Sequence, residues 1–165
     1  MITQEYIKEM MQYVDEIGEL TWKKITTNRV KIGGIIGSPT TNGYKYTKLW
    51  GKRYSAHRLV WLYHHGCFPT NDIDHIDGDR LNNRIENLRE ATRKENTLNT
   101  GMRTNNTSGY KGVSWNKRAG KWSSEAWMNG KKNYLGLFLT PSAASNAYNT
   151  FCKEHHGEFY RDSTA

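Results

Sequence analysis

The 165-residue sequence contains few of the residues that stabilise secreted domains, with only two cysteines, Cys67 and Cys152, and three prolines. No Cys-x-x-Cys pair occurs, which argues against a cysteine-based zinc site. Two isolated cysteines are typical of free thiols in a reducing compartment. No apolar run approaches the roughly 20 residues that a membrane-spanning helix requires.

The N-terminal segment MITQEYIKEMMQYVDEIGEL carries acidic residues where a secretory signal peptide would be basic and then apolar. We therefore expect an intracellular protein without a signal peptide, a transmembrane segment or a membrane partner. The length fits one or two small domains.

Positive charge exceeds negative charge, with 24 Lys and Arg residues against 16 Asp and Glu residues, a formal net charge of +8. The excess is +3 up to Asn99 and +5 in the shorter segment from Thr100 onward, which is also rich in Trp and Tyr. A basic charge can simply aid solubility. Its concentration beside aromatic residues favours a polyanionic partner such as nucleic acid.

Hydrophobic periodicity predicts a mixed α+β chain. We expect a helix over 4–16, strands over 20–24, 29–36 and 43–57, and a second helix over 56–65 that Gly66 ends. The dipeptide Gly51–Lys52 is expected to turn a hairpin within the third strand region.

The stretch DIDHIDGDRLNNRIENLREATRKENTLN, residues 72–99, predicts a strand, a polar loop, a second strand and the start of a helix. Thr92 is a suitable N-cap for that helix, and Glu95 stands at the capping-box position. A calcium loop of the EF-hand type is excluded by register, because the third acid falls at Asp77, one place late, and the twelfth position is Asn83.

The same stretch gathers the groups that hydrolysis of a phosphodiester requires. Asp74 and Asn96 offer hard oxygen ligands for a divalent ion such as Mg²⁺, and His75 offers a base that is active near neutral pH. The Asn87 side chain can orient that imidazole. Adjacent side chains on a strand face opposite ways, so Asp74 and His75 share one site only if the strand twists or ends there.

The alternative interpretation is a polar loop that caps a structural domain. Asparagines serve turns and helix caps, and we prefer that role for Asn82 and Asn83. For Asp74, His75, Asn87 and Asn96 together we prefer the catalytic interpretation.

The segment IDHIDGDRLNNRIENLREATRKENTLN, preceded by AHRLVWLYHHG, resembles the HNH homing endonucleases of phage genomes. The resemblance implies the ββα-metal fold, with metal ligands Asp74 and Asn96, His75 as general base and Asn87 orienting His75 and holding the loop. His57 would be a neighbour of the site. The last position of the motif is Asn here, which favours Mg²⁺ or Mn²⁺ over Zn²⁺.

The C-terminal segment is expected to form three strands and a helix over 141–155, with Thr140 as N-cap and Pro141 at the first helical position. The candidates for DNA binding are Lys111, Trp115, Lys117, Arg118, Lys121 and Trp122. Because alternate strand residues face inward, some of the aromatic residues Trp122, Tyr134 and Phe138 are expected to lie in the core.

The sequence from Ser108 to Gly157 resembles the AP2 DNA-binding domain. The matching motifs are YKGV (110–113), GKW (120–122), Glu125, YLGLF (134–138) and TPSAASNAY (140–148). The resemblance implies a three-stranded antiparallel sheet packed on one helix. Lys111 replaces an arginine of the plant pattern, and Ser114 and Met128 lack its charge at two other positions.

The resulting hypothesis has three parts: an HNH nuclease domain over 1–99, with N-terminal strands over 1–55 and a ββα-metal core over 56–99; a linker over 100–109; and an AP2-like domain over 110–165. It predicts a metal-dependent endonuclease that nicks double-stranded DNA as a monomer or weak dimer, leaving a 5′-phosphate and a 3′-hydroxyl. We expect no organic cofactor, and a location in the cytoplasm of a bacterial or phage-infected host. The alternatives are a catalytically inert DNA-binding regulator and an RNA-directed nuclease.

Overall fold

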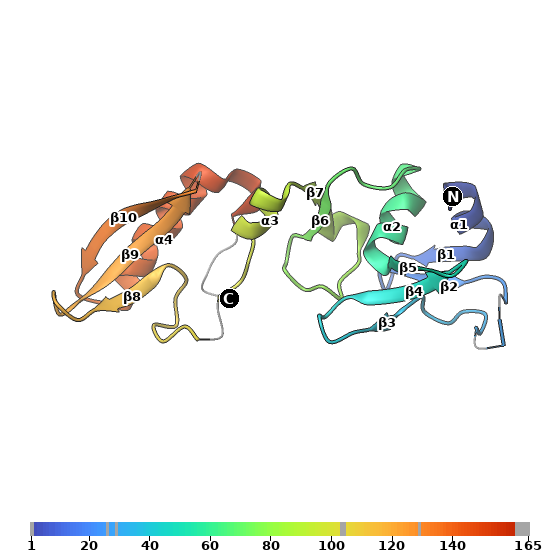
Figure 1. The fold of residues 1–165 in the computed structure, drawn as a ribbon, viewed down its shortest axis with the longest axis horizontal. Helices are drawn as coiled ribbons and strands as arrows, with labels where there is room; N and C mark the ends of the chain where they lie inside the picture. The colour runs from blue at the N-terminus through green and yellow to red at the C-terminus, as the bar shows by residue number, and fades with distance from the viewer. Residues whose placement is uncertain (1, 26, 29, 103–104, 129, 161–165) are drawn as a thin grey trace. The chain divides into compact units, whose positions relative to one another are not determined.

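In the computed structural model, which describes residues 2–25, 27–28, 30–102, 105–128 and 130–160, the chain divides between Asn96 and Thr97. The two units, Met1–Asn96 and Thr97–Ala165, each have their own core (Figure 1). The division falls inside the helix that ends the predicted nuclease domain. Residues 103–104 of the predicted linker and 161–165 of the predicted second domain lie outside the described residues.

The first unit begins with a helix that is shorter than the sequence pattern predicts. Helix α1 spans Gln4–Met10 and begins after Thr3, whose hydroxyl accepts a hydrogen bond from the amide of Tyr6. Strand β1 (Met11–Val14) follows and pairs antiparallel with β2 (Glu19–Trp22). The predicted helix over 4–16 is therefore wrong beyond Met10, because Met11 and Tyr13 are buried with the period of two that a strand requires.

Strands β3 (Ser38–Pro39), β4 (Lys45–Leu49) and β5 (Lys52–Ser55) form an antiparallel sheet in that order. Trp50 and Gly51 turn the β4–β5 hairpin with φ values of 49° and 79°. The predicted hairpin is confirmed, but its turn lies one residue before the predicted Gly51–Lys52, because Lys52 pairs with Leu49. The described part of the predicted strand over 29–36 contributes one bridge, between Ile35 and Thr21, because a turn at Gly33 interrupts it.

Helix α2 (Ala56–His65) buries Leu59, Val60 and Leu62 and ends at Gly66 in the left-handed conformation, as predicted. Strand β6 (Asp72–His75) then pairs with β7 (Leu88–Ala91), and the 3₁₀ turn η1 (Ile85–Asn87) lies just before β7. Ile73 of β6 and Leu88 of β7 belong to the same core as α2. This shared core fixes the hairpin on the rest of the unit.

Helix α3 (Arg93–Leu98) confirms the predicted order of strand, loop, strand and helix. The Glu95 amide donates to Thr92 Oγ1 at 3.3 Å, and the Thr92 amide donates to Glu95 Oε2 at 2.8 Å. These two hydrogen bonds are the reciprocal contacts of a capping box. They hold the start of α3 directly after β7.

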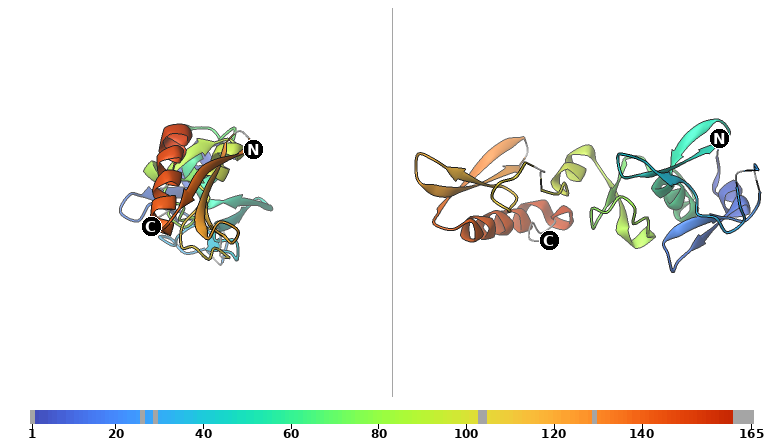
Figure 2. Two further views of the ribbon diagram at one scale, coloured as in Figure 1. Left: turned by 90° about the vertical axis from the view of Figure 1, so that its left-hand side faces the viewer. Right: turned by 90° about the horizontal axis from the view of Figure 1, so that it is seen from below.

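The second unit is a three-stranded antiparallel sheet with a helix on one face, as predicted (Figure 2). Its strands are β8 (Val113–Asn116), β9 (Lys121–Met128) and β10 (Lys131–Phe138), with β9 in the centre. Helix α4 (Pro141–His156) packs across all three strands and is followed by the 3₁₀ turn η2 (Gly157–Phe159). The core joins Ala126 of β9 to Tyr148 and Cys152 of α4.

The first turn of α4 follows the predicted local chemistry. The Thr140 hydroxyl accepts a hydrogen bond from the amide of Ala143 at 3.2 Å, and Pro141 occupies the first turn. Among the helices of the described residues, none has the length and apolar character to cross a membrane.

Candidate functional site

The His75 side chain lies at the end of β6 in a buried cluster, with 3% of its surface exposed. Its ring centroid is 5.3 Å from that of His57 in an edge-on arrangement and 5.9 Å from that of Tyr44. Its Nε2 atom lies 3.2 Å from Oδ1 of Asn83. The imidazole is therefore held by two neighbouring rings and one side-chain amide.

The second imidazole, His57, stands in the first turn of α2. Its Nε2 atom lies 3.2 Å from the Ser55 hydroxyl, and its ring is 5.2 Å from that of Tyr44. Burial, together with the positive charges that His75 and Arg58 can carry, lowers the pKa of His57 to about 3. His57 is therefore neutral at neutral pH.

Burial also lowers the pKa of His75 below that of an ordinary histidine. Its contact with Asn83 and the nearby carboxylates of Asp77, Asp74 and Asp79 oppose this shift but do not cancel it. The His75 ring is consequently unprotonated at neutral pH, which is the state that a general base needs.

The carboxylate of Asp74 is 4% exposed and pairs with Arg89, the residue directly opposite on β7. Arg89 Nε and Nη2 donate to Asp74 Oδ2 at 2.9 and 2.7 Å. Strand β6 ends at His75, as the shared-site hypothesis requires. The two neighbours nevertheless have different partners, because Asp74 contacts Arg89 whereas His75 contacts Asn83 and His57.

Asn87 is the residue that we predicted to orient His75 and to hold the loop. It is buried at the end of η1, directly before β7. Its Oδ1 accepts from the Asp77 amide at 3.0 Å, and its Nδ2 donates to Asp77 Oδ1 and the Asn82 carbonyl, each at 2.9 Å. The amide that contacts the His75 ring belongs to Asn83, for which the sequence pattern suggested only a turn role.

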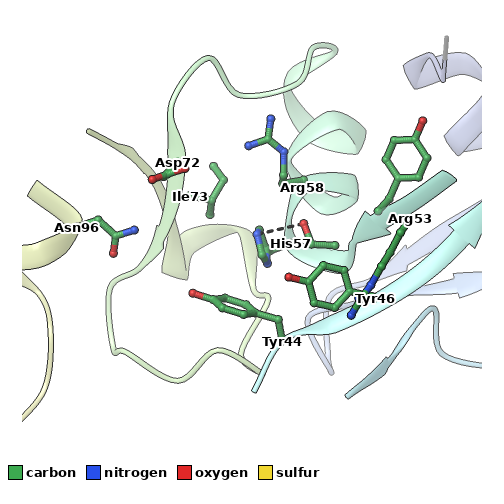
Figure 3. A pocket seen from close by; sticks show the side chains of 10 residues that line it. Tyr44, Tyr46, Arg53, His57, Arg58, Asp72, Ile73 and Asn96 are labelled. Atoms are coloured by element: carbon green, nitrogen blue, oxygen red, sulfur yellow. Dashed lines mark hydrogen bonds between the residues drawn. The ribbon is translucent and has the colours of Figure 1, made fainter. Parts of the chain in front are cut away.

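A pocket of about 490 Å³ lies beside these imidazoles. Figure 3 shows Asn96 and Asp72 at one end, Arg53 and Tyr46 at the other, and His57 between them, with the Ser55 contact drawn as a dashed line. The pocket is lined by Tyr44, Tyr46, Arg53, Tyr54, Ser55, His57, Arg58, Asp72, Ile73 and Asn96. The predicted metal ligand Asn96 therefore lines this pocket together with His57, whereas Asp74 and His75 are not among its lining residues.

The outer face of the β4–β5 hairpin carries functional candidates that the sequence pattern did not single out. Tyr46 pairs with Ser55 and Lys48 with Arg53, so these four side chains share one face. The Arg53 guanidinium carbon lies 3.8 Å from the centroid of the Tyr46 ring, within cation–π range. The period-two spacing of the tyrosines and Lys48 in GYKYTK is a sequence signal for this face.

In the second unit, the DNA-binding candidates fall into different environments. Lys117, Arg118 and Lys121 are exposed around the β8–β9 turn. Lys111 is half-buried, and its ammonium group donates to the carbonyls of Leu98 at 2.9 Å and Thr100 at 2.6 Å. These two hydrogen bonds hold the segment around Leu98 and Thr100, which precedes the sheet.

Trp115 and Trp122 pair across β8 and β9 with ring centroids 5.1 Å apart, and Trp115 is the more exposed of the two. Tyr134, a candidate core residue, is 61% exposed and lies opposite Glu125, whereas Ala126 faces α4. Trp127 is equally exposed. Because strand residues alternate between faces, Trp127 and Tyr134 lie on the sheet face away from α4.

A family model described as HNH endonuclease matches residues 54–98. Protein 3.8 of Escherichia phage T7 is 36% identical over 118 residues, which cover 71% of this chain and 97% of that protein. The chain belongs to the HNH endonuclease family. A putative HNH homing endonuclease of the SPbeta prophage of Bacillus subtilis (strain 168) is 35% identical over 115 residues, which cover 69% of this chain and 65% of the relative.

The C-terminal unit of this HNH endonuclease has separate relatives. An AP2-like ethylene-responsive transcription factor of Arabidopsis thaliana is 41% identical over 51 residues, which cover 31% of this chain and 10% of that protein. This partial match supports the AP2-like character of the unit. No solved structure matches the chain.

HNH nucleases generally use divalent metal ions, and the oxygen donors of this centre fit a hard cation. The Asp74 carboxylate has about four lone-pair positions, so it can bind a cation while Arg89 donates to it. No group of three His, Cys, Asp or Glu side chains gathers around one point in the described residues. A site with one carboxylate, one amide and several water ligands is typical of Mg²⁺.

Proposed function

We propose that this HNH endonuclease hydrolyses phosphodiester bonds of double-stranded DNA with Mg²⁺ or Mn²⁺ as cofactor, and that His75 is its general base. The observation that carries the proposal is the position of His75. The imidazole is buried at the end of β6, directly after Asp74, and its Nε2 contacts Asn83. Burial also lowers its pKa, which favours the neutral form. A neutral imidazole beside a carboxylate suits the activation of water next to a metal-bound phosphate.

In this mechanism Asp74 and Asn96 hold the divalent ion. When bound, the ion supplies the positive charge that stabilises the phosphate and the departing oxygen. The His75 ring takes a proton from the attacking water, whose oxygen forms the new bond to phosphorus. The bond from phosphorus to the 3′-oxygen breaks, the departing oxygen takes a proton from a solvent water molecule, and the products are a 5′-phosphate and a 3′-hydroxyl.

Two basic surfaces support DNA as the substrate. Arg53, oriented by its contact with Tyr46, lies at the end of the pocket that Asn96 also lines. In the AP2-like unit, Lys117, Arg118 and Lys121 provide exposed positive charge for phosphate contacts. One catalytic centre per chain predicts that a monomer nicks one strand, and that a double-strand cut needs a dimer or two successive events.

The test is incubation of the full chain with supercoiled plasmid and Mg²⁺ or Mn²⁺. We expect conversion to nicked plasmid by the wild-type protein, and no conversion by His75→Ala although this variant binds DNA normally. His65→Ala is the matched control, because His65 is an exposed histidine at the end of α2. Cleavage by His75→Ala at the wild-type rate would refute the base assignment.

The same assay separates the competing functions. A wild-type protein that binds plasmid but leaves it intact with either ion would be a DNA-binding protein with an inert centre. Cleavage of structured RNA in preference to duplex DNA would identify an RNA-directed nuclease. Mapping of the cleaved ends in a random-sequence DNA pool would then give the target site.

A further inference from the structure

The loop between β6 and η1 is tied together by side-chain hydrogen bonds. Asp77 Oδ1 accepts from the Asp79 amide at 2.8 Å and from Asn87 Nδ2 at 2.9 Å, while Asp77 Oδ2 accepts from Asn82 Nδ2 at 2.6 Å. Asn87 Nδ2 also donates to the Asn82 carbonyl. This network fixes the chain immediately before Asn83.

Asn83 turns inward from this loop. It is 1% exposed, although it lies between half-buried Asn82 and half-buried Arg84. Its Oδ1 atom contacts His75 Nε2 at 3.2 Å, and both side chains are buried. Among the described residues the buried Nδ2 atom of Asn83 has no hydrogen-bond partner, so Oδ1 makes the one contact that orients this amide toward His75.

A neutral imidazole carries its one proton on either Nδ1 or Nε2, and the group that contacts one nitrogen decides which. A carbonyl oxygen only accepts hydrogen bonds, so Asn83 Oδ1 requires the proton on His75 Nε2. The lone pair that can accept a proton is then on Nδ1. Nε2 thus donates the hydrogen bond that orients the ring, and Nδ1 has the lone pair that can accept a proton from water.

We propose that Asn83 is a positioning residue that keeps the His75 imidazole protonated at Nε2, so that Nδ1 is the atom that receives the proton from water. This inference deepens the proposed function and rests on it for its catalytic consequence. Asn87 acts one step further away, because its amide builds the loop through Asp77 and Asn82. The neighbouring His57 ring contributes packing, and its own Nε2 faces Ser55.

The first experiment measures the tautomer directly in the metal-free full chain. Long-range ¹H–¹⁵N NMR spectra of ¹⁵N-labelled protein, recorded at about pH 8 where histidine is neutral, distinguish protonated from unprotonated ring nitrogens. Comparison with His75→Gln assigns the His75 signals. We expect a single tautomer protonated at Nε2. A ring protonated at Nδ1, or an equal mixture, in the wild-type protein would overturn the proposal.

The second experiment changes the acceptor. Asn83→Leu has a similar size without the carbonyl and should give a mixture of tautomers, whereas Asn83→Asp retains an oxygen acceptor and should keep Nε2 protonated. Leu81→Ala is the matched control, because Leu81 is an exposed residue of the same loop whose side chain takes no part in the hydrogen-bond network that places Asn83. An Asn83→Leu protein that keeps the wild-type tautomer would refute the role of the amide.

Cleavage kinetics complete the test. For Asn83→Leu we expect kcat to fall by about 10²-fold, the typical contribution of general-base catalysis, with KM for DNA unchanged. An equal fall in kcat for the Leu81→Ala control would show a general loop effect and count against Asn83. If Asn83→Leu does not fold, the wild-type and Asn83→Asp spectra decide. If the wild-type protein shows the expected tautomer but cleaves no nucleic acid, the proposed function fails and the positioning role stands.

Discussion

Asp74 and Arg89 face each other across the β6–β7 hairpin as a buried ion pair, with Arg89 Nη2 2.7 Å from Asp74 Oδ2. Their side chains are 5% and 13% exposed, respectively. The carboxylate that we assign to the metal is therefore compensated by a guanidinium within the protein itself. Loss of either partner leaves a buried charge without its counterion, which is far more costly than the intact pair is favourable.

Arg89→Ala should lower the free energy of unfolding by about 3 kcal/mol, because it strands the Asp74 carboxylate in the protein interior. Urea denaturation followed by circular dichroism measures this change. The control is Lys24→Ala, which removes the exposed ion pair of Lys24 with Glu9 and should leave stability unchanged. Equal effects of the two variants would contradict a buried pair at Asp74.

Addition of Mn²⁺ should recover part of the stability lost in Arg89→Ala, because a bound cation would compensate the Asp74 carboxylate in place of the guanidinium. The measurement is the urea midpoint with and without metal. The double variant Asp74→Asn/Arg89→Ala should not respond. A response of the double variant equal to that of Arg89→Ala would place the ion elsewhere.

The stability of the first unit should fall on acidification, owing to His57. Its pKa is about 3 in the folded state and 6.5 in the unfolded state, so the unfolded chain binds the extra proton between these values. The free energy of unfolding should therefore rise with pH in this window, by up to about 1.4 kcal/mol per unit from one histidine, and level off above it. The lowered pKa of His75 acts in the same direction.

Urea titrations over the range from about pH 5 to 7.5 test this dependence. His57→Gln removes the titrating group, so its stability should change less steeply with pH than that of the wild-type protein. Identical slopes for the two proteins would show that His57 is protonated as easily in the folded state as in the unfolded state.

DNA binding should depend on salt through the cluster of Lys117, Arg118 and Lys121. Each phosphate contact contributes about 0.9 to the slope of log affinity against log salt concentration. The triple alanine variant should therefore bind more weakly, with the slope reduced by up to about three. Lys111→Ala should keep the wild-type slope, since the Lys111 ammonium group donates to backbone carbonyls. Fluorescence anisotropy at several salt concentrations distinguishes these outcomes.

The aromatic face of the second unit should contribute to affinity without contributing to stability. Trp127 and Tyr134 are each 61% exposed, so Trp127→Ala and Tyr134→Ala should leave the melting temperature unchanged. We expect each to weaken DNA binding by about tenfold, the loss of roughly 1.4 kcal/mol that an interface aromatic residue commonly contributes. Tyr148→Ala is the contrasting variant, because Tyr148 is 7% exposed and should lower the melting temperature. Wild-type affinity in both exposed variants would exclude this face as the DNA-binding surface.

The local signals in the sequence predicted much of the fold correctly. The caps at Thr92, Thr140 and Gly66 lie where their residue types indicated, because a cap depends on groups within one helical turn. The order of elements around β6 and β7 follows from equally local patterns. The predicted helix over 4–16 extended too far, since the pairing of Met11–Val14 with β2 outweighs its local helical pattern.

The sequence by itself determined the identity of the predicted site groups and their order along the chain: the Asp74 carboxylate, the His75 imidazole and the side-chain amides of Asn87 and Asn96. Only the tertiary structure decided their partners. Arg89 meets Asp74 because the hairpin register places them opposite each other, and Asn83 meets His75 because the Asp77 network turns the loop inward. Such contacts depend on register and loop path, which residue type and local periodicity do not specify.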